Sequence, residues 1–288
     1  MGKLIWLASF PKSGNTWLRA FLHNLLMNPE RPVPLDDLVR FCHQDSDAQW
    51  FQAVLDGRSD QITPYQSDSQ RRTADLSKEE VARLRPLTHE ILTRTHPDSV
   101  FVKTHNALVV NRGTSTITMA HTAGAIYVVR NPLDVAVSYA DHLGVSIDEA
   151  ITRLASKMET SNTARAVYEY RGNWSEHVES WTRANSPGLY VVRYEDLQAK
   201  PEAAFGAICQ FLGLGAAPER LRKAIEFSAF EQLSRQEAEE GFRERTAAQQ
   251  KFFRQGKVGG WREVLTPAQV ARLAARHGAQ MARFGYKI

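Results

Sequence analysis

The stretch from Lys3 to Met27 constrains the fold more than any other part of this 288-residue chain. It opens with a continuous apolar run over residues 4–10, which predicts a strand buried on both faces. A tight polar loop follows at 11–16, and apolar residues then recur at helical spacing. A strand, a loop and a helix in this order direct backbone amides and the positive end of a helix dipole at one point. Such a point binds an anion.

The residues of this loop have the chemistry of a phosphate or sulfate site. Gly14 permits close backbone approach, Lys12 supplies a mobile cation, and the hydroxyls of Ser13 and Thr16 supply donors. The Walker A pattern G-x-x-x-x-G-K-[ST] is absent, because the lysine precedes the glycine and no GK[ST] occurs in the chain. A small polar loop between a strand and a helix is also ordinary in α/β proteins, so the loop alone leaves both readings open.

Three further apolar runs continue this pattern at residues 99–105, 124–130 and 188–194. They alternate with helical segments, which is typical of parallel strands covered on both faces. We therefore predict an α/β fold, with a central parallel sheet flanked by helices and a P-loop-like strand–loop–helix at the N-terminus. Because ligands bind at the carboxyl ends of such strands, Lys12, His105 and Arg130 are expected to converge.

Composition narrows the choice of function. The net charge of +4 is a mild basic excess, too diffuse to indicate nucleic-acid binding. The apolar runs are shorter than the ~18 to 20 residues of a membrane span. Cys42 and Cys209 match no metal-ligand spacing and are typical of reduced thiols, so we expect a cytoplasmic protein with no metal site. From the charge and the short apolar runs, we expect no nucleic-acid partner and no membrane partner.

The domain organisation is expected to be simple, with one domain over residues 1–288 and a loop-rich insertion at about 28–98. A short helix is expected at 35–41, and a longer one after Ser77, where Ser77 and Glu80 form a capping box. The charged, glycine-punctuated segment 236–260 by itself predicts an exposed loop.

Several segments resemble the PAPS-dependent sulfotransferase family of the cytosolic type, in the order in which that family has them. The loop Pro11–Trp17 is similar to the family's PKSGTTW loop, which binds 3′-phosphoadenosine 5′-phosphosulfate (PAPS). The remaining segments are 101–105, similar to the strand with the catalytic histidine; 127–139, similar to the 3′-phosphate segment; 193–197 and 227–230, similar to the adenine contacts; and 254–261, similar to the family's RKGxxGDW segment.

The resemblance implies which residues bind PAPS and its product PAP. They are Lys12, Ser13, Gly14, Asn15, Thr16, Trp17, Arg130, Ser138, Tyr194, Ser228, Phe230, Arg254, Gln255 and Gly256. Arg130, Ser138 and Arg254 would hold the 3′-phosphate, while Trp17, Tyr194 and Ser228 would contact the adenine. The chain departs from the family at Gln255, where a lysine is usual, and at Gly260, where an aspartate is usual.

The resemblance also implies that His105, Lys12 and Lys103 carry the catalysis, without a metal. His105 would take the proton of an acceptor hydroxyl or amine during in-line attack on sulfur, and an ordinary imidazole pKa of ~6.5 suits this role. Lys12 would neutralise charge on the leaving group, and Lys103 would hold the sulfuryl oxygens. A P-loop kinase using ATP and a noncatalytic nucleotide-binding module are the alternatives; the missing GK[ST] and the pair His105 and Lys103 argue against them.

The acceptor is expected to be a small molecule or carbohydrate-like, bound by residues 28–98 and 140–171. Aromatic candidates there favour a hydrophobic alcohol, and basic candidates favour an anionic or sugar-like acceptor, so both remain open. The aromatic candidates are Phe41, Trp50, Phe51 and Tyr65, and the basic ones are Arg71, Arg72 and Arg94. Segment 262–271 departs from the family's vertebrate dimer motif at Pro267 and Ala271, which predicts a monomer or a dimer built otherwise.

Overall fold

The computed structural model describes residues 2–57 and 72–288. Its central sheet has the strand order β2-β3-β1-β6-β9, and every neighbouring pair is parallel. The strands are β1 (Lys3–Ser9), β2 (His43–Gln44), β3 (Ser99–Thr104), β6 (Thr122–Val129) and β9 (Leu189–Arg193). The predicted parallel sheet is confirmed, and β2 is an edge strand too short to be recognised from an apolar run.

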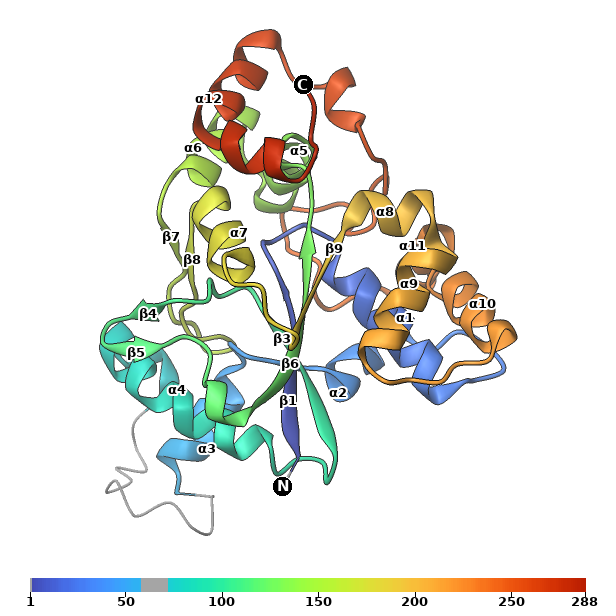
Figure 1. The fold of residues 1–288 in the computed structure, drawn as a ribbon. Helices are drawn as coiled ribbons and strands as arrows, with labels where there is room; N and C mark the ends of the chain where they lie inside the picture. Colours follow the sequence, from blue (N-terminus) through green and yellow to red (C-terminus); the bar gives the residue numbers. More distant parts are fainter. Residues whose placement is uncertain (1, 58–71) are drawn as a thin grey trace.

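Helices cover both faces of the sheet, as predicted (Figure 1). The helices α1 (Asn15–Met27), α9 (Pro201–Phe211) and α10 (Pro218–Phe227) cover one face, and α5 (Pro132–Leu143), α7 (Trp174–Thr182) and α12 (Pro267–Arg283) cover the other. Strand β1 serves both layers, because successive side chains of a strand point to opposite faces. Trp6 packs in the α5–α7 core and Leu7 in the α1–α9 core.

Smaller elements complete the fold. The other helices are α2 (Leu38–Phe41), α3 (Ala48–Leu55), α4 (Lys78–Leu92), α6 (Ile147–Ala155), α8 (Tyr194–Ala199) and α11 (Phe230–Glu240), with 3-10 turns η1 (Leu35–Asp37), η2 (Thr73–Asp75), η3 (Met119–His121) and η4 (Gly260–Glu263). Two short hairpins pair β4 (Val110–Asn111) with β5 (Thr114–Ser115), and β7 (Met158–Glu159) with β8 (Tyr170–Gly172). The predicted capping box of Ser77 and Glu80 begins α4.

The segment 236–260 differs from the exposed loop that its composition predicts. Helix α11 continues to Glu240, and Phe253 is buried. The buried carboxylate of Glu237 accepts hydrogen bonds from the amides of Phe252 and Phe253, at 2.6 and 2.9 Å. The charged residues of this segment therefore face partners within the protein as well as water.

No helix within residues 2–57 and 72–288 combines the length and the apolar character needed to cross a bilayer.

Candidate active site

A cavity of about 1990 Å³ lies where the strands β1, β3, β6 and β9 end. Lys12 follows β1, Lys103 and His105 stand at the end of β3, and Arg130 and Tyr194 follow β6 and β9; all five line this cavity. The parallel sheet thus brings together residues that are more than a hundred positions apart in the sequence.

The loop between β1 and α1 has a strained backbone. Lys12 has a φ of 65° and Gly14 a φ of 101°, and a Cβ at Gly14 would lie 2.6 Å from the Tyr194 ring, so a side chain there is excluded. The ammonium of Lys12 lies 4.1 Å from the centroid of the Phe252 ring. Burial lowers the pKa of Lys12 to about 8, partly opposed by Asp141. The cation is therefore desolvated but still largely charged at neutral pH.

Asn15 and Ser13, both at this loop, differ in their hydrogen bonding. Asn15 donates to the backbone oxygen of Leu7 at 2.7 Å, which ties the start of α1 to strand β1. The hydroxyl of Ser13 is buried and has no hydrogen-bond partner among the described residues. A buried polar atom without a partner is costly, and a ligand that accepts its hydrogen bond removes that cost.

His105 is held in one tautomer. Its Nδ1 lies 2.7 Å from the backbone oxygen of Ser9, and since a carbonyl can only accept, Nδ1 carries the proton and Nε2 keeps a free lone pair. His177 donates from Nε2 to the backbone oxygen of His105 at 3.2 Å and accepts from Tyr127. Burial, with the nearby charge of Lys103, lowers the pKa of His105 to about 3. The imidazole is thus neutral at physiological pH, and its pKa is well below the ordinary value expected for a base in this position.

A buried carboxylate fixes the neighbours of His105. Asp45 accepts hydrogen bonds from Thr104 at 2.8 Å and from Asn106 at 2.6 Å, the residues on either side of the histidine. It also pairs with Arg85 and His89, each at 2.9 Å. These partners hold the pKa of Asp45 well below its usual value although burial raises it. The network ties both residues that flank His105 to one buried carboxylate.

Arg130 joins two segments of the site, the loop after β1 and the segment 254–261. Its guanidinium donates to the backbone oxygens of Lys12 at 2.9 Å and Lys257 at 3.1 Å, and it lies 4.3 Å from the centroid of the Tyr194 ring. The Nε atom has no hydrogen-bond partner in the described part of the chain. Arg130 is therefore positioned by the protein and retains a donor for a ligand.

Three rings form an aromatic wall beside this arginine. Trp17 and Tyr194 meet edge to face with centroids 5.6 Å apart, and Phe230 lies against Gly256, where a Cβ would be 2.4 Å from the ring. The Tyr194 hydroxyl donates to the backbone oxygen of Gly256 at 3.2 Å. These contacts attach segment 254–261 to the rest of the site.

The structure places the predicted site residues in two groups. Those that line the cavity are Lys12, Gly14, Asn15, Thr16, Trp17, Lys103, His105, Arg130, Ser138, Tyr194, Phe230, Arg254, Gln255 and Gly256. Ser13 and Ser228 do not line it and are buried. The Ser228 hydroxyl donates to the backbone oxygen of Ala224 at 2.8 Å, so it is engaged within its own helix end.

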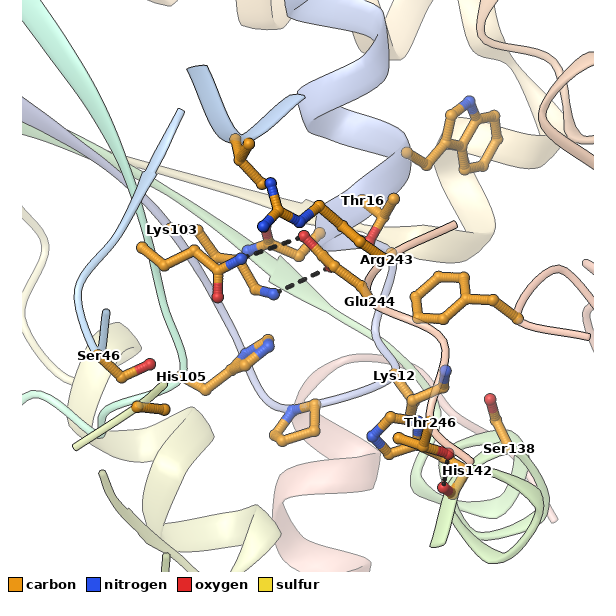
Figure 2. Close-up of a pocket in the computed structure, with 18 of the residues that line it drawn as sticks. Lys12, Thr16, Ser46, Lys103, His105, Ser138, His142, Arg243, Glu244 and Thr246 are labelled. Atoms are coloured by element: carbon orange, nitrogen blue, oxygen red, sulfur yellow. Dashed lines mark hydrogen bonds and ion pairs between the residues drawn. The ribbon is translucent and has the colours of Figure 1, made fainter. Parts of the chain in front are cut away.

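Three contributing residues were missed from the sequence. Asp134, in the segment after Arg130, accepts from the amides of Gly259 and Trp261 at 2.8 and 3.0 Å and so anchors the glycine-rich loop that lacks the family's aspartate. Glu244 pairs with Arg19 at 2.8 Å. It also pairs with Lys103 at 3.2 Å, as Figure 2 shows. No local sequence pattern predicts the pair of Arg19 and Glu244, because the two residues are separated by 225 positions.

The side of the cavity beyond His105 is polar. The ion pair of Glu169 and Arg171, 2.6 Å apart, contributes to its wall, together with Gln44, Gln49 and Arg165. Trp50 adds one aromatic surface.

Of the acceptor contacts predicted from the sequence, Trp50 and Arg72 line the cavity. Phe51 is fully buried, and the half-buried Phe41 stacks on His23. Arg94 pairs instead with Glu90, at 2.5 Å. Tyr65 and Arg71 lie outside the described residues.

Known proteins share both the sequence pattern and the fold of this chain. A family model described as a sulfotransferase domain matches residues 3–285. Relatives include cytosolic sulfotransferase 13 of Arabidopsis thaliana, 26% identical over 271 residues covering 91% of this chain and 72% of the relative, and 3-beta-hydroxysteroid sulfotransferase of Cavia porcellus, 29% identical over 179 residues. The second match spans 58% of either chain, less than two thirds of that relative's length.

Two solved structures have a similar fold. One is mouse sulfotransferase SULT7A1 complexed with PAP, with a TM-score of 0.61 and 20% identity over 97% of this chain and 85% of that one. The other is retinol dehydratase in complex with androsterone and inactive cofactor PAP, with a TM-score of 0.63 and 18% identity over 96% of this chain and 80% of that one. These matches confirm the predicted fold class.

Proposed function

Because the chain belongs to the sulfotransferase domain family, we propose that it transfers the sulfuryl group of PAPS to a hydroxyl or amine of a small-molecule acceptor. One observation carries this proposal beyond family membership. A neutral imidazole with a free Nε2 shares one cavity with the cations Lys12 and Lys103, at the carboxyl edge of a parallel sheet.

The cavity has features that fit PAPS. The Nε of Arg130, which lines the cavity, lacks a partner within the described chain and can donate to phosphate oxygens. The hydroxyl of Ser13 also lacks a partner within the described chain; it is buried next to the cavity, between the lining residues Lys12 and Gly14. Trp17 and Phe230 offer aromatic surface for an adenine ring. Two similar folds are those of proteins crystallised with PAP, which supports the same choice.

Each catalytic role follows from a position in the cavity. PAPS supplies an activated sulfuryl group on a phosphate leaving group. His105 accepts the acceptor's proton at Nε2, because Nδ1 is committed to Ser9. Lys12 places a desolvated positive charge against the leaving oxygen, and Lys103 places a second one beside His105. A bound bisphosphate brings negative charge, which favours the protonated forms of His105, Lys12 and Lys103. It therefore opposes the lowering of their pKa values by burial.

We infer that the acceptor carries several polar groups. In the cavity wall, Glu169, Arg171 and Gln44 already have partners within the protein, but each still presents polar atoms to the cavity. Hydroxyl groups of an acceptor can hydrogen-bond to these atoms, whereas an apolar molecule would only remove water from them. This wall includes part of residues 28–98, which we assign as an acceptor-side insertion in a single domain over residues 1–288. The described part of the insertion contains α2, α3 and α4 as well as loops.

Location and assembly are also inferences. The buried, unpaired thiols of Cys42 and Cys209 suit a reducing cytoplasm, as do the plant relatives named cytosolic. The departures from the vertebrate dimer motif at Pro267 and Ala271 support a monomer or a dimer that does not use that motif. Light scattering distinguishes the two states.

The activity is tested by following radiolabelled sulfur from PAPS in the presence of sugars, glycosides, phenols and steroid alcohols. The proposal expects label in a hydroxyl-bearing product, with polyhydroxylated acceptors preferred. Transfer from labelled ATP with Mg²⁺ instead would favour the kinase alternative. Binding of nucleotide with no transfer to any acceptor or to water would favour a noncatalytic module.

A further inference from the structure

Glu244 connects the segment after α11 to the start of helix α1. Both of its carboxylate oxygens lie within 2.9 Å of Nη2 of Arg19, whose side chain is fully buried. The same Arg19 nitrogen donates to the hydroxyl of Thr16 at 3.1 Å. Arg19 therefore fixes Glu244 relative to the predicted phosphate-binding loop.

The same carboxylate also contacts residues of β2 and β3. It accepts from Nζ of Lys103 at 3.2 Å and from the amide of Gln44 at 3.3 Å, and Figure 2 draws both contacts in the cavity that contains His105. Arg19 and Lys103 keep the pKa of Glu244 at about 2, so the group is an anion at neutral pH. Burial lowers the pKa of Lys103, and Glu244 opposes that effect.

A lysine side chain has four rotatable bonds, and a buried ammonium without a counter-charge loses its proton readily. We propose that Glu244, anchored by Arg19, is a positioning residue that holds the Lys103 ammonium beside His105, where it contacts the sulfuryl group. This inference rests on the proposed function. In this role Glu244 does not touch the substrates and affects the reaction only through Lys103.

Comparing two nucleotides separates this role from a structural one. PAP lacks the sulfuryl group, so a defect confined to Lys103 weakens the binding of PAPS and spares that of PAP. A general loosening of the segment over the cavity weakens both nucleotides alike, because that segment also carries Phe252, Arg254 and Gly256.

The test is Glu244→Gln, with the dissociation constant of PAP measured by calorimetry and that of fresh PAPS by displacement of PAP. We expect PAPS affinity and turnover to fall by about tenfold or more, as for other small displacements of catalytic groups, while PAP affinity stays within about twofold. Glu244→Asp, which keeps the charge on a shorter side chain, should recover part of the loss.

Glu237→Gln is the matched control. Glu237 anchors the same segment through the amides of Phe252 and Phe253, so its loss should weaken PAP and PAPS to the same extent.

A second variant controls for a loss of stability in Glu244→Gln. Glu244→Gln leaves the buried Arg19 without its carboxylate, which lowers stability. The double variant Arg19→Met, Glu244→Gln removes both charges and still deprives Lys103 of its partner. It also removes the donor to Thr16, which lowers the affinity for both nucleotides, so PAPS should lose more affinity than PAP.

Equal loss of both nucleotides, unchanged PAPS binding, or the failure of both variants to fold would overturn the positioning role. If the unmodified protein bound neither PAP nor PAPS, the proposed function would fail first and this inference with it.

Discussion

The side chain of His105, at the end of β3, donates from Nδ1 to the backbone oxygen of Ser9, the last residue of β1, across 2.7 Å. A neighbouring strand thereby sets the tautomer of the histidine and leaves Nε2 available to the cavity. The relationship depends on the parallel register in which Ala8 pairs with Thr104.

His105→Ala removes the base without removing a nucleotide contact. We expect turnover to fall by ~10²-fold or more, while the affinity for PAP stays near that of the unmodified protein. Steady-state kinetics and calorimetry measure the two quantities. His96→Ala, at an exposed position, is the control and should change neither. Unchanged turnover in His105→Ala would remove the histidine from the reaction.

Acidification should destabilise the fold through histidines that are neutral when buried. Burial lowers the pKa values of His105 and His177 to about 3, from 6.5 in an unfolded chain. Below pH 6.5 the unfolded state therefore binds more protons, and stability is full above that value and falls toward pH 3. Each histidine contributes about 1.4 kcal/mol per pH unit. Urea unfolding between pH 7 and 5 should show this slope, and a smaller one in His105→Ala; equal slopes would contradict the shift.

Lys12 should give PAP binding an alkaline limit. Its pKa of about 8 in the free protein means that the cation is present at neutral pH and lost above pH 8. PAP affinity should then fall by up to ~10-fold per pH unit above that value, since binding must restore the proton. Lys12→Arg keeps its charge throughout and should lack this limit. A flat affinity up to pH 9.5 in the unmodified protein would contradict a lysine with a lowered pKa at the phosphates.

Arg130→Ala should abolish recognition of the 3′-phosphate. The loss of a charge-assisted, partly buried contact is expected to cost ~2–4 kcal/mol of PAP affinity and to erase the preference for PAP over AMP. Arg153→Ala, which breaks only a surface pair with Glu149, is the control. If Arg130→Ala still preferred PAP as strongly, another residue would read that phosphate.

The sheet could be predicted because the sequence pattern of each strand is contained within the strand itself. Each of β1, β3, β6 and β9 carries its own apolar run, and parallel pairing then places Lys12, His105 and Arg130 at one edge. The residue roles came from the resemblance rather than from these patterns.

Properties that depend on distant contacts could not be predicted. The pair of Arg19 and Glu244 joins positions 225 apart, and neither neighbourhood indicates the other. The pKa of His105 is low because of tertiary burial, which the sequence around the histidine does not reveal. Ser228 carries a hydroxyl that could contact an adenine ring. In the structure, however, this hydroxyl donates to the backbone oxygen of Ala224.

The central claim is that this cavity binds a 3′-phosphorylated adenine nucleotide for sulfuryl transfer. Calorimetric titration with PAP and with ATP, both without Mg²⁺, tests it most directly. The account predicts tight binding of PAP and much weaker binding of ATP, with no gain for PAP when Mg²⁺ is added. Tighter binding of ATP than of PAP, or no binding of PAP, would contradict it.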